Sequence, residues 1–516
     1  MSAILQLTDY LRLPIVAIVC VCLTIKLVHI LWYHYVVSTG RDPNCKAPLP
    51  PGGMGWPIIG ESFYVLIQGS QFYSDSFRRF GTRMFKTHLF GSPTIRIYGA
   101  ENLHTILHGE HNLVESSWPK STQTLLGNVL TLSSGDRHTI LRRHVSRAFT
   151  HDALEGYVHL ALSVYKLHGS IVMCSLQPSI QDGVDSWSRE ESVLAFDVTR
   201  RLFFEIASVV LCGFDRREIE GEVMATAFMD FTRGFFTLPF DLPGTPYRKA
   251  LTARKTLLKN LDKVVNKKLK LSPEEDKRDA LRILMEHDED MEGHVSTESL
   301  KADMLDLLNA GFNTTSSAAT TLLYHISKKP ELLKRIRREL AELRLLERSN
   351  GLTFDRLTEC KYLTNVVKEG LRMGPPIGGG FRKVLKTFEL EGYQIPKGWT
   401  IIYSIRDTIE LSEGYSNKDQ FNPDRFNPDR QEDQKGGRYN YPIFGGGSRS
   451  CMGKQFAQLI LKILLVELAR TCSVEPLYKE PVKFRAMPIP HPVEDLPLRF
   501  KKLDPSDIVK DAMSTV

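Results

Sequence analysis

The feature that most constrains this chain is a glycine-rich loop running into a long apolar helix near the C-terminus. The segment from Tyr441 to Ala469 reads YPIFGGGSRSCMGKQFAQLILKILLVELA. Three consecutive glycines permit a tight loop with positive φ, and the apolar positions after Cys451 recur at helical spacing. Cys451 is therefore predicted to lie at a loop-to-helix junction. There, free backbone N–H groups and the positive end of the helix would stabilise a thiolate.

Composition excludes several classes of protein. The chain has 516 residues, of which 42% are hydrophobic and 25% charged, so it is neither disordered, fibrous, a small disulfide scaffold nor a polytopic membrane protein. The net charge of +7 arises from 67 Lys and Arg against 60 Asp and Glu. Without clustered basic stripes, it favours a membrane surface or an acidic partner over nucleic acid. The eight cysteines form no Cys-x-x-Cys, so most are expected to be buried thiols in a reducing compartment.

The N-terminus carries one long apolar run, from Leu11 to Val37, which is long enough to cross a bilayer as a helix. Residues 1–40 are therefore predicted to contain a membrane anchor, with a cleaved signal peptide and a buried core helix as alternatives. Prolines and glycines make residues 41–60 a short, rigid connector. Residues 61–502 are predicted to form one large helix-rich domain with short strands in MFKTHLF, PTIRIYG and WTIIYSI, and residues 503–516 a C-terminal tail.

The string Phe-Gly-x-Gly-x-Arg-x-Cys-x-Gly around Cys451 resembles the haem-binding signature of the cytochrome P-450 superfamily. The resemblance implies the prism fold of that superfamily, mainly α with small β-sheets: a single large catalytic domain behind an N-terminal membrane anchor. It also implies haem, with iron held by the Cys451 thiolate, which favours O–O cleavage, and NADPH used indirectly through a reductase. Gly453 would leave room for the flat group, Phe444 would provide an aromatic wall, and Arg449 would reach an anionic group on it.

Two charges three residues apart in NVVKEGLRM fit the same family. Glu369 and Arg372 share one helix face in an apolar surround, and a buried pair of this kind needs a third partner. Arg425 supplies one within Phe-Asn-Pro-Asp-Arg-Phe, which resembles the family's Pro-Glu-Arg-Phe element. A tandem copy ends at Arg430, but Phe426 completes the pattern after Arg425. The three residues are interpreted as a structural lock for the cysteine loop, whereas a surface ion pair would contribute little.

The segment DMLDLLNAGFNTTSSAATTLLYHIS resembles the long helix that crosses the distal face of the haem. By that resemblance, Gly311 would make room for dioxygen and Thr314 would hold waters that deliver protons. The family usually has an acid where this chain has Asn313. An amide can orient water but cannot relay a proton as a carboxylate does, so slower turnover or more hydrogen peroxide leakage is expected.

Basic residues are expected around the haem propionates. His138 and Arg142 lie one turn apart in a segment that resembles the family's Trp-x-x-x-Arg helix, and Arg382 falls where another donor is often found. The alternative is a surface basic patch that attracts an acidic reductase, and both can hold. That patch would draw on Arg142, Arg143, Arg147, Lys454 and Lys462.

Several strings resemble the retinoic-acid-hydroxylating branch, family 26, most specifically GGGFRKVLKTFELEGYQIPKGWTIIYSI at Gly378–Ile405. The implied reaction is hydroxylation and inactivation of all-trans-retinoic acid, an apolar polyene with a carboxylate. Arg96 is the candidate partner of that carboxylate. An apolar channel suits a polyene, and the candidate lining residues, each equally expected as core, are Trp118, Phe236, Phe312 and Ile377.

Other functions remain open at this point. The substrate is alternatively a sterol or fatty acid, and Asn313 motivates a haem-thiolate isomerase or rearrangement enzyme that does not use dioxygen. A non-catalytic retinoid-binding protein is the last alternative. The expected partners are NADPH–cytochrome P-450 reductase, the membrane and a small apolar substrate, with no nucleic acid. The family default implies the endoplasmic reticulum membrane, with the catalytic domain facing the cytosol.

Overall fold

The computed structural model describes residues 2–159, 176–216, 222–272, 278–286, 296–485 and 489–513. Contacts divide the chain into two compact units. The first comprises residues 1–117 and 379–407, and the second residues 118–378 and 408–516. The predicted domain over residues 61–502 thus contains parts of both units.

The first unit holds a five-stranded mixed sheet in the order β1–β2–β8–β5–β3. Strands β2 and β8 run parallel, and the other neighbours run antiparallel. The three predicted strand runs lie in β1, β2 and β8, so these predictions are confirmed. The elements of this unit are α1 (Ser2–Gly40), α2 (Ser62–Gln68), α3 (Ser70–Phe80), β1 (Met84–Leu89), β2 (Ser92–Ile97), α4 (Ala100–His108), β3 (Val114–Ser116), β5 (Gly379–Val384), β6 (Phe388–Leu390), β7 (Tyr393–Ile395) and β8 (Thr400–Ser404). A short helix, α18 (Ile405–Glu410), leads out of it.

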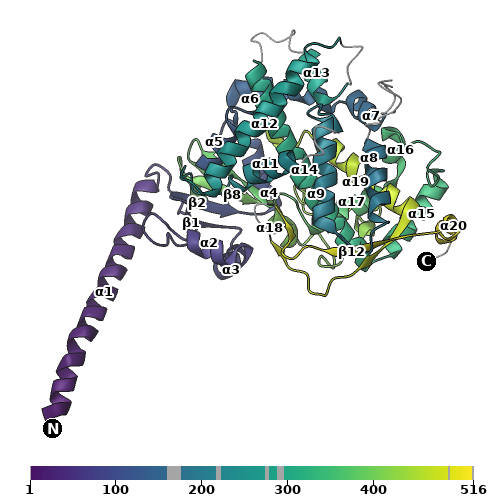
Figure 1. The fold of residues 1–516 in the computed structure, drawn as a ribbon. Helices are drawn as coiled ribbons and strands as arrows, with labels where there is room; N and C mark the ends of the chain where they lie inside the picture. Colours follow the sequence, from purple (N-terminus) through teal and green to yellow (C-terminus); the bar gives the residue numbers. More distant parts are fainter. Residues whose placement is uncertain are drawn as a thin grey trace. The chain divides into compact units, whose positions relative to one another are not determined.

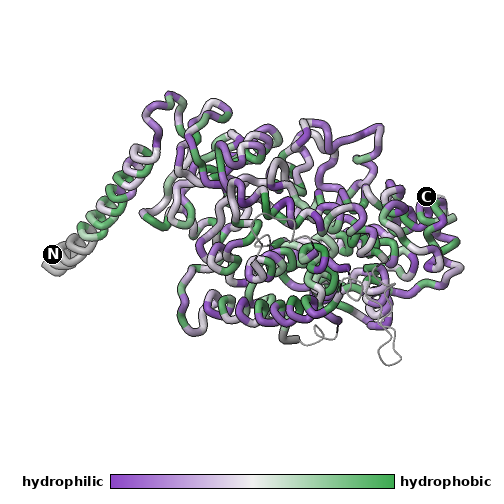
Figure 2. The backbone as a smooth tube through the Cα atoms, turned by 90° about the horizontal axis from the view of Figure 1, so that it is seen from above, coloured by the Kyte–Doolittle hydropathy of each residue, from purple (hydrophilic) through white to green (hydrophobic). Residues whose placement is uncertain are grey.

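The N-terminal helix α1 is the long element drawn in purple in Figure 1. Its segment Val16–Gly40 has 25 residues and a mean hydropathy of 2.1, and no residue of its apolar 18-residue window is buried. Figure 2 shows the apolar colouring along this segment. Among the described residues it is the one helix that is long and apolar enough to cross a membrane.

The connector after α1 is fastened to the first unit by two buried side chains. The indole Nε1 of Trp399 donates to the carbonyl oxygen of Gly40 at 2.9 Å. The amide of Gln394 accepts from the N–H of Asp42 at 2.7 Å and donates to the carbonyl oxygen of Cys45 at 3.0 Å. Backbone groups of an irregular segment need such partners when they are removed from water. The start of the connector is therefore held in one conformation.

The second unit is built around α14, the 32-residue helix Thr297–Lys328. Ser296 caps its N-terminus by accepting from the N–H of Ser299 at 3.2 Å. Most of its side chains are buried, and helices α9, α12, α17 and α19 pack against it (Figure 1). The other helices are α5 (Lys120–Leu126), α6 (Gly135–Ser146), α7 (His151–His159), α8 (Leu176–Trp187), α9 (Ala195–Val210), α11 (Glu222–Arg233), α12 (Pro246–Lys268), α13 (Ala280–Glu286), α15 (Glu331–Glu342), α16 (Phe354–Glu359), α17 (Lys361–Met373), α19 (Lys454–Thr471) and α20 (Pro505–Met513).

Short 3₁₀ helices and two small sheets complete the second unit. The 3₁₀ helices are η1 (Leu130–Leu132), η2 (Arg147–Phe149), η4 (Pro423–Phe426) and η5 (Gly447–Arg449). One sheet has the order β4–β12–β9 and the other pairs β10 with β11. Their strands are β4 (Val193–Leu194), β9 (Cys472–Pro476), β10 (Phe484–Arg485), β11 (His491–Pro492) and β12 (Pro497–Lys502). The described chain is mainly helical with small sheets, as its sequence predicts.

Two helical glycines should respond oppositely to alanine. At Gly370 in α17, a Cβ would lie 2.3 Å from Leu322 of α14, whereas none of the described residues lies within 4 Å of a Cβ at Gly156 in α7. We expect Gly370→Ala to lower the free energy of unfolding by about 1–3 kcal/mol through overpacking. Gly156→Ala should raise it by about 0.5–1 kcal/mol because alanine favours the helix. Denaturant unfolding of both variants measures this, and equal shifts would contradict the close packing of α14 on α17.

Candidate active site

The cysteine loop, residues 441–453, brings Cys451 to the start of α19. Gly445 and Gly447 have φ values of 66° and 62°, a region that favours glycine. A Cβ on Gly446 would lie 2.2 Å from the hydroxyl oxygen of Tyr439. The N–H of Cys451 donates to the carbonyl oxygen of Phe444 at 2.9 Å and closes the loop. The predicted loop-to-helix junction is thus present.

The thiol of Cys451 is accessible although protein surrounds it. Its residue is exposed, yet burial raises the pKa of the Cys451 thiol. The N–H of Gly453 and the charges of Arg142 and Lys454 act in the opposite direction and lower this pKa. An accessible sulfur in a desolvated setting, flanked by donors and cations, is suited to binding a metal as the thiolate.

The surroundings of the thiol leave room for a flat group. A Cβ on Gly453 would meet nothing closer than a ring carbon of Phe149 at 3.8 Å. Leu307 of α14 and Met452 beside the thiol pack against one apolar cluster, formed by Leu130, Leu141 and Val145. The cysteine loop and α14 therefore meet at one apolar cluster, and the residues around Cys451 fit a haem held by its thiolate.

The middle of α14 is accessible between two buried stretches. Ala310 is exposed and Gly311, Asn313 and Thr314 are partly exposed, while positions 315–323 are buried. The hydroxyl of Thr314 donates to the carbonyl oxygen of Ala310 at 2.7 Å, a bond that loosens a helix locally. A Cβ on Gly311 would lie 3.1 Å from Leu211 at the end of α9, so this glycine also permits close helix packing. The roles of Gly311, Asn313 and Thr314 with oxygen stay predictions.

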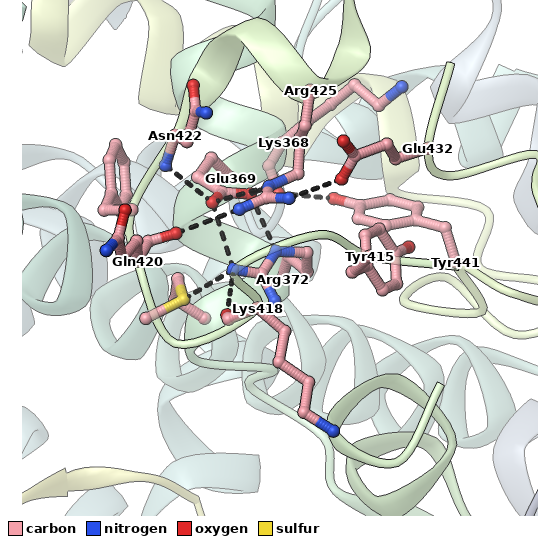
Figure 3. A network of polar contacts seen from close by, with 12 residues as sticks. Lys368, Glu369, Arg372, Tyr415, Lys418, Gln420, Asn422, Arg425, Glu432 and Tyr441 are labelled. Carbon is pink, nitrogen blue, oxygen red and sulfur yellow. Dashed lines mark hydrogen bonds and ion pairs between the residues drawn. The ribbon is translucent and has the colours of Figure 1, made fainter. Parts of the chain in front are cut away.

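The structure brings Glu369, Arg372 and Arg425 together (Figure 3). The carboxylate of Glu369 is fully buried and accepts from Nε of Arg372 at 2.8 Å and from Nε of Arg425 at 3.0 Å. Arg425 is also fully buried, whereas Arg430 remains 32% exposed and reaches only Glu432 among acids within salt-bridge distance in the described chain. The tandem repeat is thereby resolved in favour of Arg425.

Two further partners of this lock are not indicated by any sequence pattern. Glu432 accepts from Arg425 at 2.5 Å, and the N–H of Asn422 donates to Glu369 at 2.8 Å. Burial alone would raise the pKa of Glu432, but hydrogen bonds from Arg430, Ser416 and Arg425 lower it to about 2. Glu432 therefore remains ionised and neutralises the second arginine.

Three of the predicted propionate donors lie in the second unit. Arg142 of α6 donates to the carbonyl oxygen of Ser450 at 2.7 Å. Burial lowers its pKa and Cys451 raises it, so the two groups are within electrostatic reach. His138 is buried on the same helix. Arg449 donates to the carbonyl oxygens of Thr131, at 3.3 Å, and Ser133. Arg382, in the first unit, pairs with Glu110 at 2.8 Å.

One member of the expected basic patch is misplaced. Lys462 is buried, and its Nζ donates to the carbonyl oxygen of Leu357 at 2.9 Å. Helix α16 packs against α19 and accepts this lysine, so Lys462 does not belong to the basic patch. Arg143 and Lys454 are exposed and Arg147 is partly exposed, so these three lie at least partly at the surface.

The candidate substrate residues differ in setting. Phe236 and Ile377 are each 41% exposed, and Trp118 is partly exposed. Phe312 is buried, with its ring 5.1 Å from that of Phe228, and so belongs to the aromatic core between α14 and α11. Contact of these four with a substrate stays a prediction.

Arg96 is already paired within the first unit. Its guanidinium donates to Asp407 at 2.8 Å and lies 4.2 Å from the ring of Tyr73. Its Nε is buried without a hydrogen-bond partner in the described residues. Arg96 therefore retains one donor, but Asp407 neutralises its charge, which weakens the argument for it as the partner of a carboxylate.

A family model described as Cytochrome P450 matches residues 50–490. The chain belongs to the cytochrome P450 family. It is 40% identical to cytochrome P450 26B1 of Xenopus tropicalis over 493 residues, covering 94% of this chain and 93% of that protein. Identity to the Homo sapiens 26B1 protein is 39% over 508 residues, covering 97% and 96%. Identity to cytochrome P450 26A1 of Danio rerio is 37% over 469 residues, covering 89% and 92%.

A solved structure described as retinoic acid bound cyanobacterial CYP120A1 superimposes with a TM-score of 0.80 at 29% identity, covering 89% of this chain and 100% of that one. The predicted family, its branch and the P450 fold are thereby confirmed. As a P450, the chain binds haem through a cysteine thiolate and uses electrons that a reductase supplies from NADPH. When bound, the haem supplies the activation of dioxygen.

The tandem repeat offers a matched pair of substitutions for the lock. Arg425→Lys keeps the charge but cannot form the planar fork that joins Glu369 to Glu432. We expect it to lower the free energy of unfolding by about 3–5 kcal/mol and to reduce the haem content of the purified protein. Arg430→Lys, at the partly exposed copy, should cost about 1 kcal/mol or less. Thermal unfolding and haem absorbance check both, and equal losses would contradict the assignment of Arg425.

Proposed function

We propose that this P450 hydroxylates all-trans-retinoic acid and thereby inactivates it. The observation that carries the substrate is the likeness, over 89% of the chain, to a P450 structure with retinoic acid bound. The exposed apolar side chains of Phe236 and Ile377 agree with an elongated apolar ligand. The monooxygenase chemistry itself follows from the family and from the accessible thiol of Cys451.

We propose separate roles for the residues that hold the haem and for those on α14. Cys451 holds the iron, and the N–H of Gly453 and the Arg142 and Lys454 charges favour its thiolate. Arg142, Arg382, Arg449 and His138 are proposed to meet the haem propionates. Thr314 places an accessible hydroxyl oxygen on α14, where it orients water, and the Asn313 amide beside it orients water without carrying a proton.

We also propose where the chain is located in the cell and which reductase supplies its electrons. The apolar segment Val16–Gly40 would anchor the chain in the endoplasmic reticulum membrane, with the catalytic domain facing the cytosol. The reductase is proposed to be NADPH–cytochrome P450 reductase. Arg143, Arg147 and Lys454, which are exposed or partly exposed, would attract its acidic surface.

Asn313 favours one competing function, a haem-thiolate isomerase or rearrangement enzyme that does not consume dioxygen. A reconstituted turnover with reductase, NADPH and all-trans-retinoic acid separates the two, with products followed by mass. We expect a product heavier by one oxygen atom that requires both NADPH and reductase. A product of unchanged mass, formed without NADPH, would favour the isomerase. Reductase-dependent oxidation of a sterol or fatty acid, but not of the retinoid, would overturn the substrate.

Asn313 should limit the efficiency of proton delivery. We expect Asn313→Glu to raise the fraction of NADPH consumption that appears as hydroxylated product, by about two- to tenfold, because a carboxylate relays protons that an amide cannot. Product and hydrogen peroxide measured in the same reaction give this ratio. Asn309→Glu, one helical turn earlier and partly exposed, is the matched control and should not improve it. An unchanged ratio in Asn313→Glu would count against a role for the missing acid.

A further inference from the structure

Two buried carboxylates on α14 are not used by the proposed reaction. Asp303 is 2% exposed and Asp306 is 6% exposed, and they lie one helical turn apart. Within the described residues, no lysine or arginine lies within salt-bridge distance of either carboxylate. Burying a carboxylate costs free energy unless the group is hydrogen-bonded or paired, so the partners of these two side chains matter.

Both carboxylates bind the backbone of η1. One oxygen of Asp303 accepts from the N–H of Leu130 at 3.2 Å. Asp306 accepts from the N–H of Thr131 at 3.3 Å and from its hydroxyl at 2.6 Å. The other oxygen of Asp303 is buried without a hydrogen-bond partner in the described residues.

The carbonyl oxygens of the same short segment bind the cysteine loop. Arg449, two residues before Cys451, donates to Thr131 and Ser133. Two successive hydrogen-bonded steps therefore lead from α14 through η1 to the loop that carries the haem ligand. Since Thr131 accepts from Arg449 while donating to Asp306, the two bonds should reinforce each other.

The protonation of the pair is consistent with this arrangement. Burial raises the pKa of Asp303 to about 7, while the N–H of Leu130 and the Arg137 charge lower it and Asp306 raises it. Burial likewise raises the pKa of Asp306 to about 6, against the hydrogen bonds from Thr131. Both carboxyl groups accept hydrogen bonds in either state, so the contact with η1 does not require a charge.

We propose that Asp303 and Asp306 are positioning residues that hold η1, and through it Arg449, against the haem. This inference rests on the proposed contact of Arg449 with a haem propionate. It differs from a purely structural role, in which the carboxylates would stabilise the fold without affecting the retention of haem through Arg449.

The test follows the release of haem from the purified holoenzyme to an excess of an apo haem-binding protein, together with the absorbance of the reduced carbon monoxide complex, which reports thiolate ligation. Asp306→Ala should release haem about tenfold faster, because the N–H and the hydroxyl of Thr131 both lose their acceptor. Asp306→Asn keeps an acceptor oxygen and should stay within about twofold of wild type. Thr131→Val, which removes only the hydroxyl donor, should fall between them and serves if Asp306→Ala does not fold.

A double-mutant cycle separates positioning from general stability. If Asp306 acts through Arg449, the variant with both Asp306→Ala and Arg449→Ala should release haem no faster than Arg449→Ala alone. Glu339→Ala is the control, since Glu339 is a partly buried acid that also accepts from two backbone N–H groups, those of Tyr362 and Leu363, and it should leave haem release unchanged.

Additive effects, or equal acceleration by Glu339→Ala, would overturn the inference. Unchanged release in Arg449→Ala would overturn the proposed propionate contact and the inference with it. Fast release in Arg449→Ala but not in Asp306→Ala would overturn the inference alone. Retinoic acid turnover, measured separately on the wild type, decides the proposed function independently of these outcomes.

Discussion

The second unit depends most on a carboxylate removed entirely from water. Glu369 has no exposed surface, and an isolated ionised carboxylate in that position would be prohibitively costly. Arg372 and Arg425 neutralise it, and Glu432 in turn neutralises Arg425. Because each charge in this network is satisfied only when all are in place, α17 and residues 416–432 are forced to stay together. The network is therefore a constraint on the fold more than a source of net stability.

The buried charge network around Glu369 also helps to fix the position of the cysteine loop. The hydroxyl of Tyr441, at the start of the loop, donates to the carbonyl oxygen of Lys368, directly before Glu369, at 2.8 Å. Further along, Arg142 holds Ser450, and Arg449 holds η1. Helices α17 and α6 and the segment η1 thus fix the loop from separate elements, and Figure 3 shows the first of these connections. A metal ligand held in this way is preorganised, because the backbone around it has little freedom left to lose.

Residue spacing along helices and motifs that resemble those of the family made part of this site predictable. Glu369 and Arg372 are three residues apart on one helix face, and Phe426 identified Arg425 within the tandem repeat. The partners that sequence reasoning missed lie beyond such patterns. Asp407 pairs with Arg96 across 311 residues, and Leu357 binds Lys462 across 105. Glu432 follows Arg425 by only seven residues, but no helical or strand periodicity joins them. These contacts follow from tertiary packing, so one sequence without the fold does not specify them.

The same packing bears on the proposed role of Asn313, which stands where the family usually has an acid. The hydroxyl of Thr314 already donates its hydrogen bond to the carbonyl oxygen of Ala310. The hydroxyl oxygen of Thr314 therefore acts chiefly as an acceptor for water. The nearest carboxylate on α14 is that of Asp306, eight residues before Thr314 and about 12 Å away along the helix axis. It already accepts a hydrogen bond from the hydroxyl of Thr131. With a neutral amide at 313, no acid of α14 reaches the accessible turn. If protons are delivered at this turn, as we propose, the described residues of α14 supply no carboxylate there to relay them.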